Sequence, residues 1–373
     1  MHIAGIIAEY NPFHRGHAKL LEKVRLAGAS HIVCVISGDF VQRGEPAIMD
    51  KWARARAAVA CGADLVLELP LSWALSPARR FANGGVYILD ALGCVDMLCF
   101  GSECGSLDLL LAASQALALE QTQGLIRAEL DSGSSYAAAA QAALRSHSAP
   151  LADLLSTANN TLALEYLDSL ARLNSPIRPF TIPREEGEGC RAEELRRGLR
   201  SGGDIAPLLP PAGAQVLREE AAAGRVLCGL SQAERLIFSR LCSMRKEELA
   251  ALPEVREGLE NRLFRAAQDS NSLGELLEKA KSRRFTLASL RRLALDALLG
   301  VRAEDWLQWP PYIHVLAMGG GAHDILRAAR KTTRLPIIQR AGQLHSLGAD
   351  ARECFALERR SERLWRQLLL PNK

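Results

Sequence analysis

Residues 2–17 have the sequence HIAGIIAEYNPFHRGH, in which an apolar run passes through a turn-rich segment into the start of a helix. The continuous apolar run His2–Ala8 is typical of a strand that is buried on both faces. The next segment, His17–Gly28, has apolar residues at helical spacing and a glycine where a helix would stop. This stretch therefore predicts the first strand and the first helix of a parallel β–α–β unit.

The same alternation continues through the first hundred residues. Apolar strands are expected at His31–Ser37, Asp64–Leu69 and Asp96–Phe100, with helices between them at Asp50–Gly62 and Pro77–Gly93. Helices of this length between strands form crossover connections, which join parallel strands. The fold class is therefore predicted to be α/β, with a Rossmann-like parallel sheet.

The rest of the chain is predicted to be mainly helical. Helical spacing covers 107–173, one further strand is expected at Ile177–Ile182, and PLLPPAG at 207–213 indicates a domain boundary. We therefore predict a Rossmann-like domain at 1–205 and a mainly α-helical, basic C-terminal domain at 206–373. Its helices are expected at Ser231–Met244, Glu257–Gln268, Ser272–Ser282 (capped by Ser272) and Leu287–Leu299, and short strands at Tyr312–Ala317 and Leu335–Ile338.

Composition excludes several classes of protein. The chain has 373 residues, of which 48% are hydrophobic and 24% charged, and this excludes a disordered or fibrous protein. No apolar run approaches the roughly 20 residues of a membrane span, and the first residues lack the basic leader of a signal peptide. The nine cysteines form no CxxC pair, so we expect reduced thiols, a cytoplasmic protein and no membrane partner.

Charge is distributed unevenly along the chain. Residues 251–373 hold 21 Lys and Arg against 14 Asp and Glu, a net charge of +7, which leaves −3 for residues 1–250. A basic C-terminal half is typical of a nucleic-acid contact, although a solvated helical surface rich in arginine gives the same count.

The pattern His14-Arg15-Gly16-His17 lies where the first strand is followed by the first helix. Parallel sheets bind ligands at the carboxyl ends of their strands, and a helix N-terminus offers free N–H donors to an anion. Gly16 lets the anion approach the backbone, and both imidazoles can donate hydrogen bonds to phosphate. The pattern predicts a phosphate site, whereas a metal site is disfavoured because no third His or Cys lies at ligand spacing.

Longer runs carry a more specific resemblance. EYNPFHRGH (9–17), SGDFVQRGEPA (37–47), KWARA (51–55), ADLVLELP (63–70) and CFGSE (99–103) are similar to those of the bacterial tRNA(Met) cytidine acetate ligases. That family belongs to the HIGH-type nucleotidyltransferase superfamily. The resemblance continues through 257–300 and 312–326 and is weakest over 185–250.

The resemblance implies a two-step ligation. Acetate attacks the α-phosphorus of ATP, which gives acetyl-adenylate and pyrophosphate. The acetyl group then passes to N4 of the wobble cytidine of elongator tRNA(Met), which gives N4-acetylcytidine and AMP. ATP with its Mg²⁺, acetate and elongator tRNA(Met) are therefore the expected cofactors and partners.

The resemblance and the position of each residue also predict the site. His14 and His17 are expected to be catalytic, because they would neutralise charge on the phosphates. Asp39, also expected to be catalytic, follows the second strand with Gln42 and Arg43, where they would hold acetate or the reacting phosphate. ATP is expected to be bound by Ile7, Ala8, Glu9, Tyr10, Asn11, Pro12, Phe13, His14, Arg15, Gly16, His17, Ala18, Lys19, Leu20, Gly101, Asn159, Asn160, Arg184, Glu185 and Arg196. The tRNA is expected to be bound by Arg283, Arg284, Arg291 and Arg292.

One segment departs from the superfamily pattern. Members commonly carry a Ser-x-Thr-x-x-Arg run that clasps the triphosphate, whereas here Arg191 and Glu193 hold the hydroxyl positions and Arg196 keeps that of the arginine. Carboxylates at that place repel a triphosphate unless a cation intervenes. This departure keeps open a nucleotide- or RNA-binding member without activity. An adenylyltransferase acting on a small phosphorylated metabolite also stays open, because other HIGH-type enzymes catalyse that reaction.

Overall fold

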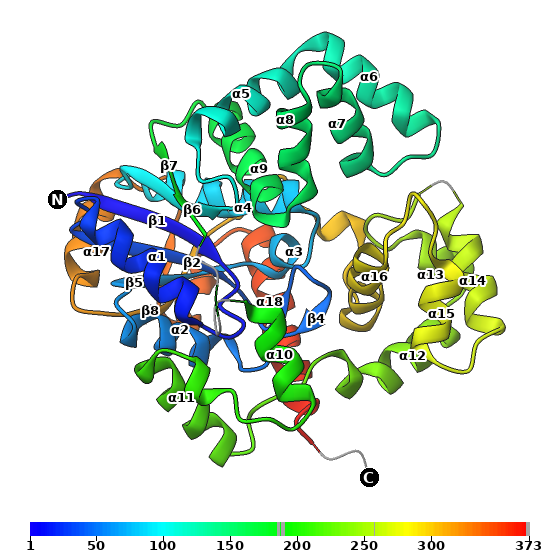
Figure 1. Cartoon of the computed structure of the whole chain (residues 1–373). Helices are drawn as coiled ribbons and strands as arrows, with labels where there is room; N and C mark the ends of the chain where they lie inside the picture. Colours follow the sequence, from blue (N-terminus) through cyan, green and yellow to red (C-terminus); the bar gives the residue numbers. More distant parts are fainter. Residues whose placement is uncertain (185–186, 188–190, 257, 371–373) are drawn as a thin grey trace.

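The computed structural model describes residues 1–184, 187, 191–256 and 258–370, and its main sheet has seven strands (Figure 1). The order of the strands across the sheet is β7-β6-β1-β2-β5-β8-β9, and all neighbours are parallel except β5 and β8. This confirms the predicted α/β class with a mostly parallel, Rossmann-like sheet. The strands are β1 (Ile3–Ala8), β2 (His31–Ser37), β5 (Leu65–Leu69), β6 (Met97–Ser102), β7 (Arg178–Pro183), β8 (Ile313–Met318) and β9 (Ile337–Ile338).

The parallel register brings five strand ends to one edge of the sheet, called here the carboxyl edge. Ala8 of β1 lies opposite Ile36 of β2, and Ser37 lies opposite Leu69 of β5. On the other side of β1, Ser102 of β6 lies opposite Pro183 of β7. The segments that follow these strands therefore emerge side by side, at the edge where parallel sheets bind ligands.

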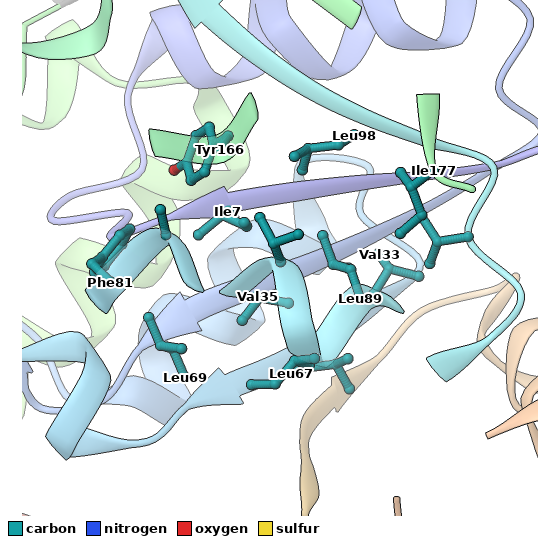
Figure 2. Packing of buried hydrophobic residues seen from close by; sticks show 14 of the residues in the cluster. Ile7, Val33, Val35, Leu67, Leu69, Phe81, Leu89, Leu98, Tyr166 and Ile177 are labelled. Carbon is teal, nitrogen blue, oxygen red and sulfur yellow. The ribbon is translucent and has the colours of Figure 1, made fainter. Parts of the chain in front are cut away.

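One face of the sheet is covered by four helices. Ile3 and Ile7 of β1 point to this face because side chains alternate along a strand. Figure 2 shows Ile7 in this layer, close to Phe81 and Leu89 of α4 and to Tyr166 of α9. The helices are α4 (Ala78–Leu92), α5 (Leu107–Ala118), α9 (Ala158–Arg172) and α17 (Ala322–Thr332).

The opposite face forms a second core. Ala4 and Ile6 of β1 point to it, and they pack with apolar residues of four other helices. These helices are α1 (Arg15–Leu26), α2 (Lys51–Ala60), α10 (Ala192–Arg200) and α11 (Pro211–Ala222). The sheet is thus covered on both sides, as its continuous apolar strands require.

A helical region beside the sheet has its own core (Figure 1). It consists of α12 (Glu234–Ser243), α13 (Lys246–Ala250), α14 (Leu259–Gln268), α15 (Leu273–Ala280) and α16 (Leu287–Leu299). The C-terminal helix α18 (Ala349–Gln367) joins the two regions, because its Phe355 packs in the sheet core and its Trp365 in the helical core. The remaining elements are the hairpin β3 (Phe40–Val41) and β4 (Glu45–Pro46), α3 (Leu71–Ala74), α6 (Glu120–Asp131), α7 (Tyr136–Arg145), α8 (Ala149–Asp153), and 3-10 turns at Leu154–Ser156, Ala206–Leu208, Leu230–Gln232, Ala303–Asp305 and Ala341–Ser346.

The predicted division between residues 205 and 206 does not follow the sheet. The strands β8 and β9 come after that boundary, yet both belong to the sheet, and α11 and α17 cover its faces. The apolar strand β8 pairs antiparallel with β5 and so covers an edge that would otherwise be open. Short strands were expected in this part of the sequence, but β5, the antiparallel partner of β8, lies more than 200 residues before it.

Smaller expectations are also met by the structure. Ser272 caps α15, because its hydroxyl accepts a hydrogen bond from the Glu275 N–H at 3.2 Å. Glu257, where α14 was expected to begin, lies outside the described residues. In the described part of the chain, no helix is both long and apolar enough to cross a membrane.

Candidate active site

His14 and His17 fix each other at the start of α1. Nδ1 of His14 accepts a hydrogen bond from the His17 backbone N–H at 3.3 Å, and Nδ1 of His17 accepts one from the His14 backbone N–H at 3.2 Å. The two rings are stacked, with centroids 3.6 Å apart and an interplanar angle of 20°. Because each Nδ1 is an acceptor, the proton of each neutral ring is on Nε2, which is left as a donor.

Both imidazoles are uncharged in this arrangement. Burial lowers the pKa of His14 to about 3, with a contribution from the guanidinium groups of Arg184 and Arg196. The pKa of His17 is also lowered, by burial and then by His14 and Arg184. Unfolded histidine takes up its proton near pH 6.5, so the stability that these rings provide is present above that pH and is lost as the pH falls towards 3.

Other residues of the segment 7–20 shape the turn between β1 and α1. The side chains of Tyr10 and Phe13 are buried and pack against the His17 ring, with centroids 4.8 and 5.5 Å from it. Tyr10 also adopts a φ of 49°, an uncommon conformation for a residue with a Cβ. These aromatic rings therefore hold the His17 ring in place from the protein interior. Other residues of the segment belong to the end of β1 and the start of α1.

Arg184 and Gly101 lie together at the ends of β7 and β6. A Cβ on Gly101 would be only 3.1 Å from Cγ of Arg184, so a larger residue would displace this side chain. Arg184 is exposed, and it is close enough to His14 and His17 to lower the pKa of both rings. The structure therefore brings four of the predicted ATP-site residues together, although Glu185, the next residue, lies outside the described part.

Asn159 and Asn160 hold the segment after β6. The Asn160 Oδ1 accepts hydrogen bonds from the N–H groups of Glu103 and Cys104 at 2.9 and 3.2 Å. The Glu103 carboxylate in turn accepts one from the Asn160 N–H at 2.8 Å and one from the Asn159 side chain. The Asn160 side chain thus fixes the segment after β6 through these hydrogen bonds, whereas Asn159 is half-buried beside it.

Asp39 is fully buried at the end of β2, with 0% of its surface exposed. Its Oδ1 accepts a hydrogen bond from the Lys51 N–H at 2.7 Å, and its Oδ2 is buried without a partner in the described structure. Burial raises the pKa of Asp39 to about 6, although Lys51 and Arg54 oppose the rise. This geometry places Asp39 under the rim of the site, where it holds the following loop rather than facing a ligand.

Arg54 of α2 ties two strand ends together. Its guanidinium is fully buried and donates to the carbonyl oxygens of Met49 at 3.0 Å, of Glu9 at 2.6 Å, and of Gly38. The exits of β1 and β2 are thereby held in one arrangement. Sequence reasoning did not single out Arg54, although a basic side chain in an otherwise alanine-rich buried helix is a signal of this kind of contact.

The hairpin β3–β4 links the carboxyl edge to the helical region. A Cβ on Gly44 would be 2.6 Å from Cβ of Arg291 and 2.7 Å from N of Arg292, both in α16, and its φ is 75°. We predict that Gly44→Ala lowers the free energy of unfolding by about 2 kcal/mol or more, because strain and overpacking add. Urea unfolding checks this value.

Gly124→Ala is the matched control for this substitution. No described residue lies within 4 Å of a Cβ at Gly124, which is inside α6, so alanine there should leave stability unchanged or raise it slightly. Equal midpoints of urea unfolding for the Gly44→Ala variant and the wild type would show that the hairpin is not packed tightly against α16.

Arg196 is used inside the protein. It is 1% exposed, its Nε lies 3.0 Å from Glu45, and it donates to Glu193 at 2.7 Å and to the Asn11 carbonyl at 2.8 Å. Two carboxylates therefore neutralise the residue that was expected to clasp a triphosphate. Its distance from His14 is still short enough to lower the pKa of that ring.

The four arginines expected to bind tRNA differ in their surroundings. Arg283 and Arg291 are exposed, and Arg284 donates to the carbonyl oxygen of Leu130 in α6. Arg292 is buried, and its guanidinium contacts the Glu254 carboxylate at 3.2 and 3.3 Å. Arg292 therefore anchors α16 within its own region and is not available on the surface, which corrects the expectation for this residue.

Comparisons with known proteins show which family the chain is similar to. The family model described as HIGH Nucleotidyl Transferase matches residues 1–373. The tRNA(Met) cytidine acetate ligase of Acetivibrio thermocellus is 36% identical over 364 residues, which cover 91% of this chain and 88% of that protein. The ligase of the same name from Caldanaerobacter subterraneus subsp. tengcongensis is 36% identical over 371 residues, covering 94% of this chain and 92% of that protein. Among solved structures, Thermotoga maritima TmcAL bound with alpha-thio ATP matches with a TM-score of 0.94 and 30% identity, over 100% of this chain and 96% of that one.

Proposed function

The chain belongs to the HIGH nucleotidyl transferase family and within it to the tRNA(Met) cytidine acetate ligases, and on this premise we propose that it activates acetate with ATP. The acetyl group then passes to N4 of the wobble cytidine of elongator tRNA(Met), so that the product is N4-acetylcytidine. The observation that carries this proposal is the stacked pair of neutral imidazoles at the N-terminus of α1.

The first step is the adenylation of acetate. A carboxylate oxygen of acetate forms a bond to the α-phosphorus of ATP, and the bond from that phosphorus to the oxygen of pyrophosphate breaks. His14 and His17 donate Nε2–H hydrogen bonds to phosphate oxygens, whose negative charge increases as pyrophosphate leaves. The positive end of the α1 dipole and the exposed guanidinium of Arg184 favour negative charge at the same place.

The adenosine and acetate ends of the intermediate have different neighbours. Gly101 is proposed to let the adenosine approach the backbone of β6, and Asn159, whose side chain contacts Glu103 in the segment after β6, is proposed to bind the ribose or the base. Gln42 and Arg43 at the tip of the β3–β4 hairpin are assigned to acetate or the reacting phosphate. The buried Nε2 of Gln42 has no hydrogen-bond partner among the described residues, and this unused donor supports the assignment.

Mg²⁺ is proposed to enter with ATP and to neutralise charge on its phosphates. Within the described ranges, no three His, Cys, Asp or Glu side chains are grouped so that they would hold a metal ion. The phosphates, rather than a cluster of protein ligands, are therefore proposed as its main partners.

The second step is transfer of the acetyl group. N4 of the cytidine forms a bond to the carbonyl carbon of acetyl-adenylate, the bond from that carbon to the phosphate oxygen breaks, and AMP leaves with the electron pair. A proton is lost from N4 in the same step. The hairpin that borders the site also contacts α16, so RNA bound to the helical region lies next to the reacting groups.

The proposal is tested by incubating the chain with ATP, ¹³C-labelled acetate and a transcript of elongator tRNA(Met). We expect N4-acetylcytidine, AMP and pyrophosphate in equal amounts, and none of them without acetate. Pyrophosphate release that does not depend on acetate would favour adenylyl transfer to a phosphorylated metabolite. Binding of ATP without any turnover would favour a member that has lost its activity.

Arg283 and Arg291 are proposed to contact phosphates of the tRNA. Both are exposed near α16, and an open pocket between α14 and α15 adds Arg262, Arg265 and Lys279 to the same region. We predict that the double variant Arg283→Ala/Arg291→Ala weakens tRNA binding about tenfold. The slope of log Kd against log salt should also fall by roughly 1 to 2, because each phosphate contact contributes about 0.7 to 0.9.

Filter binding at several salt concentrations measures both quantities. Arg327→Ala is the control, because this exposed arginine pairs with Asp324 at 3.4 Å and belongs to α17, which covers a face of the sheet. An unchanged salt slope in the double variant would place the RNA surface elsewhere.

A further inference from the structure

A buried cluster of charged side chains lies behind Asp39. Lys51, Glu68 and Glu358 are between 0 and 2% exposed, and His314 is 5% exposed. These residues come from α2, β5, α18 and β8, so the cluster joins the two ends of the chain. Burying four titratable groups is costly unless each is paired, which makes their contacts informative.

Lys51 lies between two carboxylates. Its Nζ contacts the Glu68 Oε1 at 2.6 Å, and its backbone N–H donates to the Asp39 Oδ1 at 2.7 Å. The other oxygen of Glu68 contacts His314 Nδ1 at 2.5 Å. Burial alone would raise the pKa of Glu68, but Lys51 and His314 lower it below its usual range, so Glu68 is ionised.

Gly38 lies against the carboxylates of this cluster. A Cβ at this position would be 3.0 Å from the Glu68 Oε1 and 3.4 Å from Oε2 of Glu358. Glu358 accepts a hydrogen bond from the Leu71 N–H at 2.6 Å, and burial together with the charge of Glu68 raises its pKa well above the usual value. The cluster thus holds Lys51 as a cation and Glu68 as an anion, with a protonated Glu358 beside them.

We propose that Asp39, Lys51 and Glu68 form a charge-dependent latch that positions the loop 38–47 for the adenylation of acetate. The inference rests on the proposed function. Asp39 as a carboxylate holds the first N–H of α2 at one end of the loop, and Trp365 of α18 donates to the Ala47 carbonyl at 2.7 Å at the other end. Between these two anchors, the β3–β4 hairpin positions Gln42 and Arg43 at the rim of the site. The positions of both side chains therefore depend on the hydrogen bond that Asp39 accepts from α2.

The latch opens when Asp39 takes up a proton. Its pKa of about 6 means that the charge-assisted hydrogen bond to Lys51 is present above that pH and is weakened as the pH falls below it. The charged groups that face Asp39 are Lys51 and Arg54 from α2 and Glu68 from β5, with His314 and Glu358 behind Glu68. Lys51 lowers the pKa of Asp39 and Glu68 raises it, so their removal should shift it in opposite directions.

The test is the rate of acetate-dependent ATP–pyrophosphate exchange from pH 5 to 9. In the wild type we expect the rate to fall below about pH 6. Lys51→Met should move this fall to higher pH and Glu68→Gln to lower pH, each by about one unit, with KM for ATP changed less than about threefold. The double variant Lys51→Met/Glu68→Gln removes both charges, is easier to fold, and should return the fall to near its original pH.

Three further measurements separate the possible failures. Lys331→Met and Glu353→Gln, at exposed positions of α17 and α18, should keep the wild-type profile. Asp39→Asn should lose the fall near pH 6 and lower kcat at least about tenfold. If the pH at which the rate falls moves in the same direction in Lys51→Met and Glu68→Gln, or does not move, the latch is overturned. Acetate-dependent exchange by the wild type would still support the proposed function in that case. Absence of acetate-dependent exchange in the wild type would overturn the proposed function and the latch with it.

Discussion

Substitution of His17 by alanine lowers the rate of acetate-dependent ATP–pyrophosphate exchange by about 10²- to 10³-fold, which is the scale for losing one donor to a developing charge. The neutral ring of His17 offers its Nε2–H to the phosphates, because its Nδ1 is occupied by the His14 N–H at 3.2 Å. The ring is also held by Tyr10 and Phe13, so its position is fixed before the nucleotide binds. Since burial keeps it uncharged, the loss should be similar from pH 6.5 to 8.5.

A second substitution separates catalysis from the structure of the turn. His17→Asn keeps an acceptor for the His14 N–H but has no donor at the place of Nε2, so it should lose activity as alanine does while keeping more stability. His323→Ala, at an exposed position of α17, is the matched control and should keep full activity. If His17→Asn keeps the wild-type rate, the ring does not act on the phosphates.

Substitution of Arg54 by alanine lowers the free energy of unfolding by about 3 to 5 kcal/mol. The variant leaves three carbonyl oxygens without their donor and Asp39 without one of its two neighbouring cations. Because two of these carbonyls, those of Glu9 and Gly38, belong to the exits of β1 and β2, ATP binding should weaken as well. Urea unfolding and equilibrium dialysis with ATP measure the two effects.

Arg56→Ala is the control for this variant, because it changes the same residue type in the same helix. The side chain of Arg56 is 53% exposed, and its buried partner Glu220 keeps a second contact to Arg225 when Arg56 is removed, so the loss of Arg56 should cost less than about 1 kcal/mol. Similar midpoints for the two variants would mean that Arg54 does not hold the strand ends together.

The sequence predicts the first half of the fold well because its signals are local. Apolar runs such as 3–8 and 31–37 alternate with segments of helical spacing. Each of these runs matches a strand of the sheet, and each segment between them matches a helix that covers the sheet. The strand at Ile313–Met318 is equally apolar, yet its antiparallel pairing with β5 depends on residues far apart in the sequence. Local patterns carry no information on such a partner, so the sequence does not reveal that β8 and β9, which follow the predicted boundary at residue 205, belong to the sheet.

The candidate site is predictable where residue type and strand position act together. The histidines at the start of α1, Gly101 and Arg184 are brought together because their strands end at one edge. The sequence does not reveal which charges are buried, so Asp39, Arg196 and Arg292 were expected to face ligands although the fold places them inside. Glu68 is one residue from which the sequence could have indicated buried charges. It lies in the apolar strand Leu65–Leu69, and a carboxylate among buried apolar residues needs a buried partner.

The most direct measurement is a crystal structure of the chain with a stable analogue of acetyl-adenylate in which a sulfamate replaces the phosphate. We predict sulfamate oxygens at hydrogen-bond distance, roughly 2.7 to 3.2 Å, from Nε2 of His14 and of His17, with the acetyl group next to the β3–β4 hairpin. An analogue bound away from the start of α1, or one whose sulfamate has no contact with either ring, would contradict this prediction.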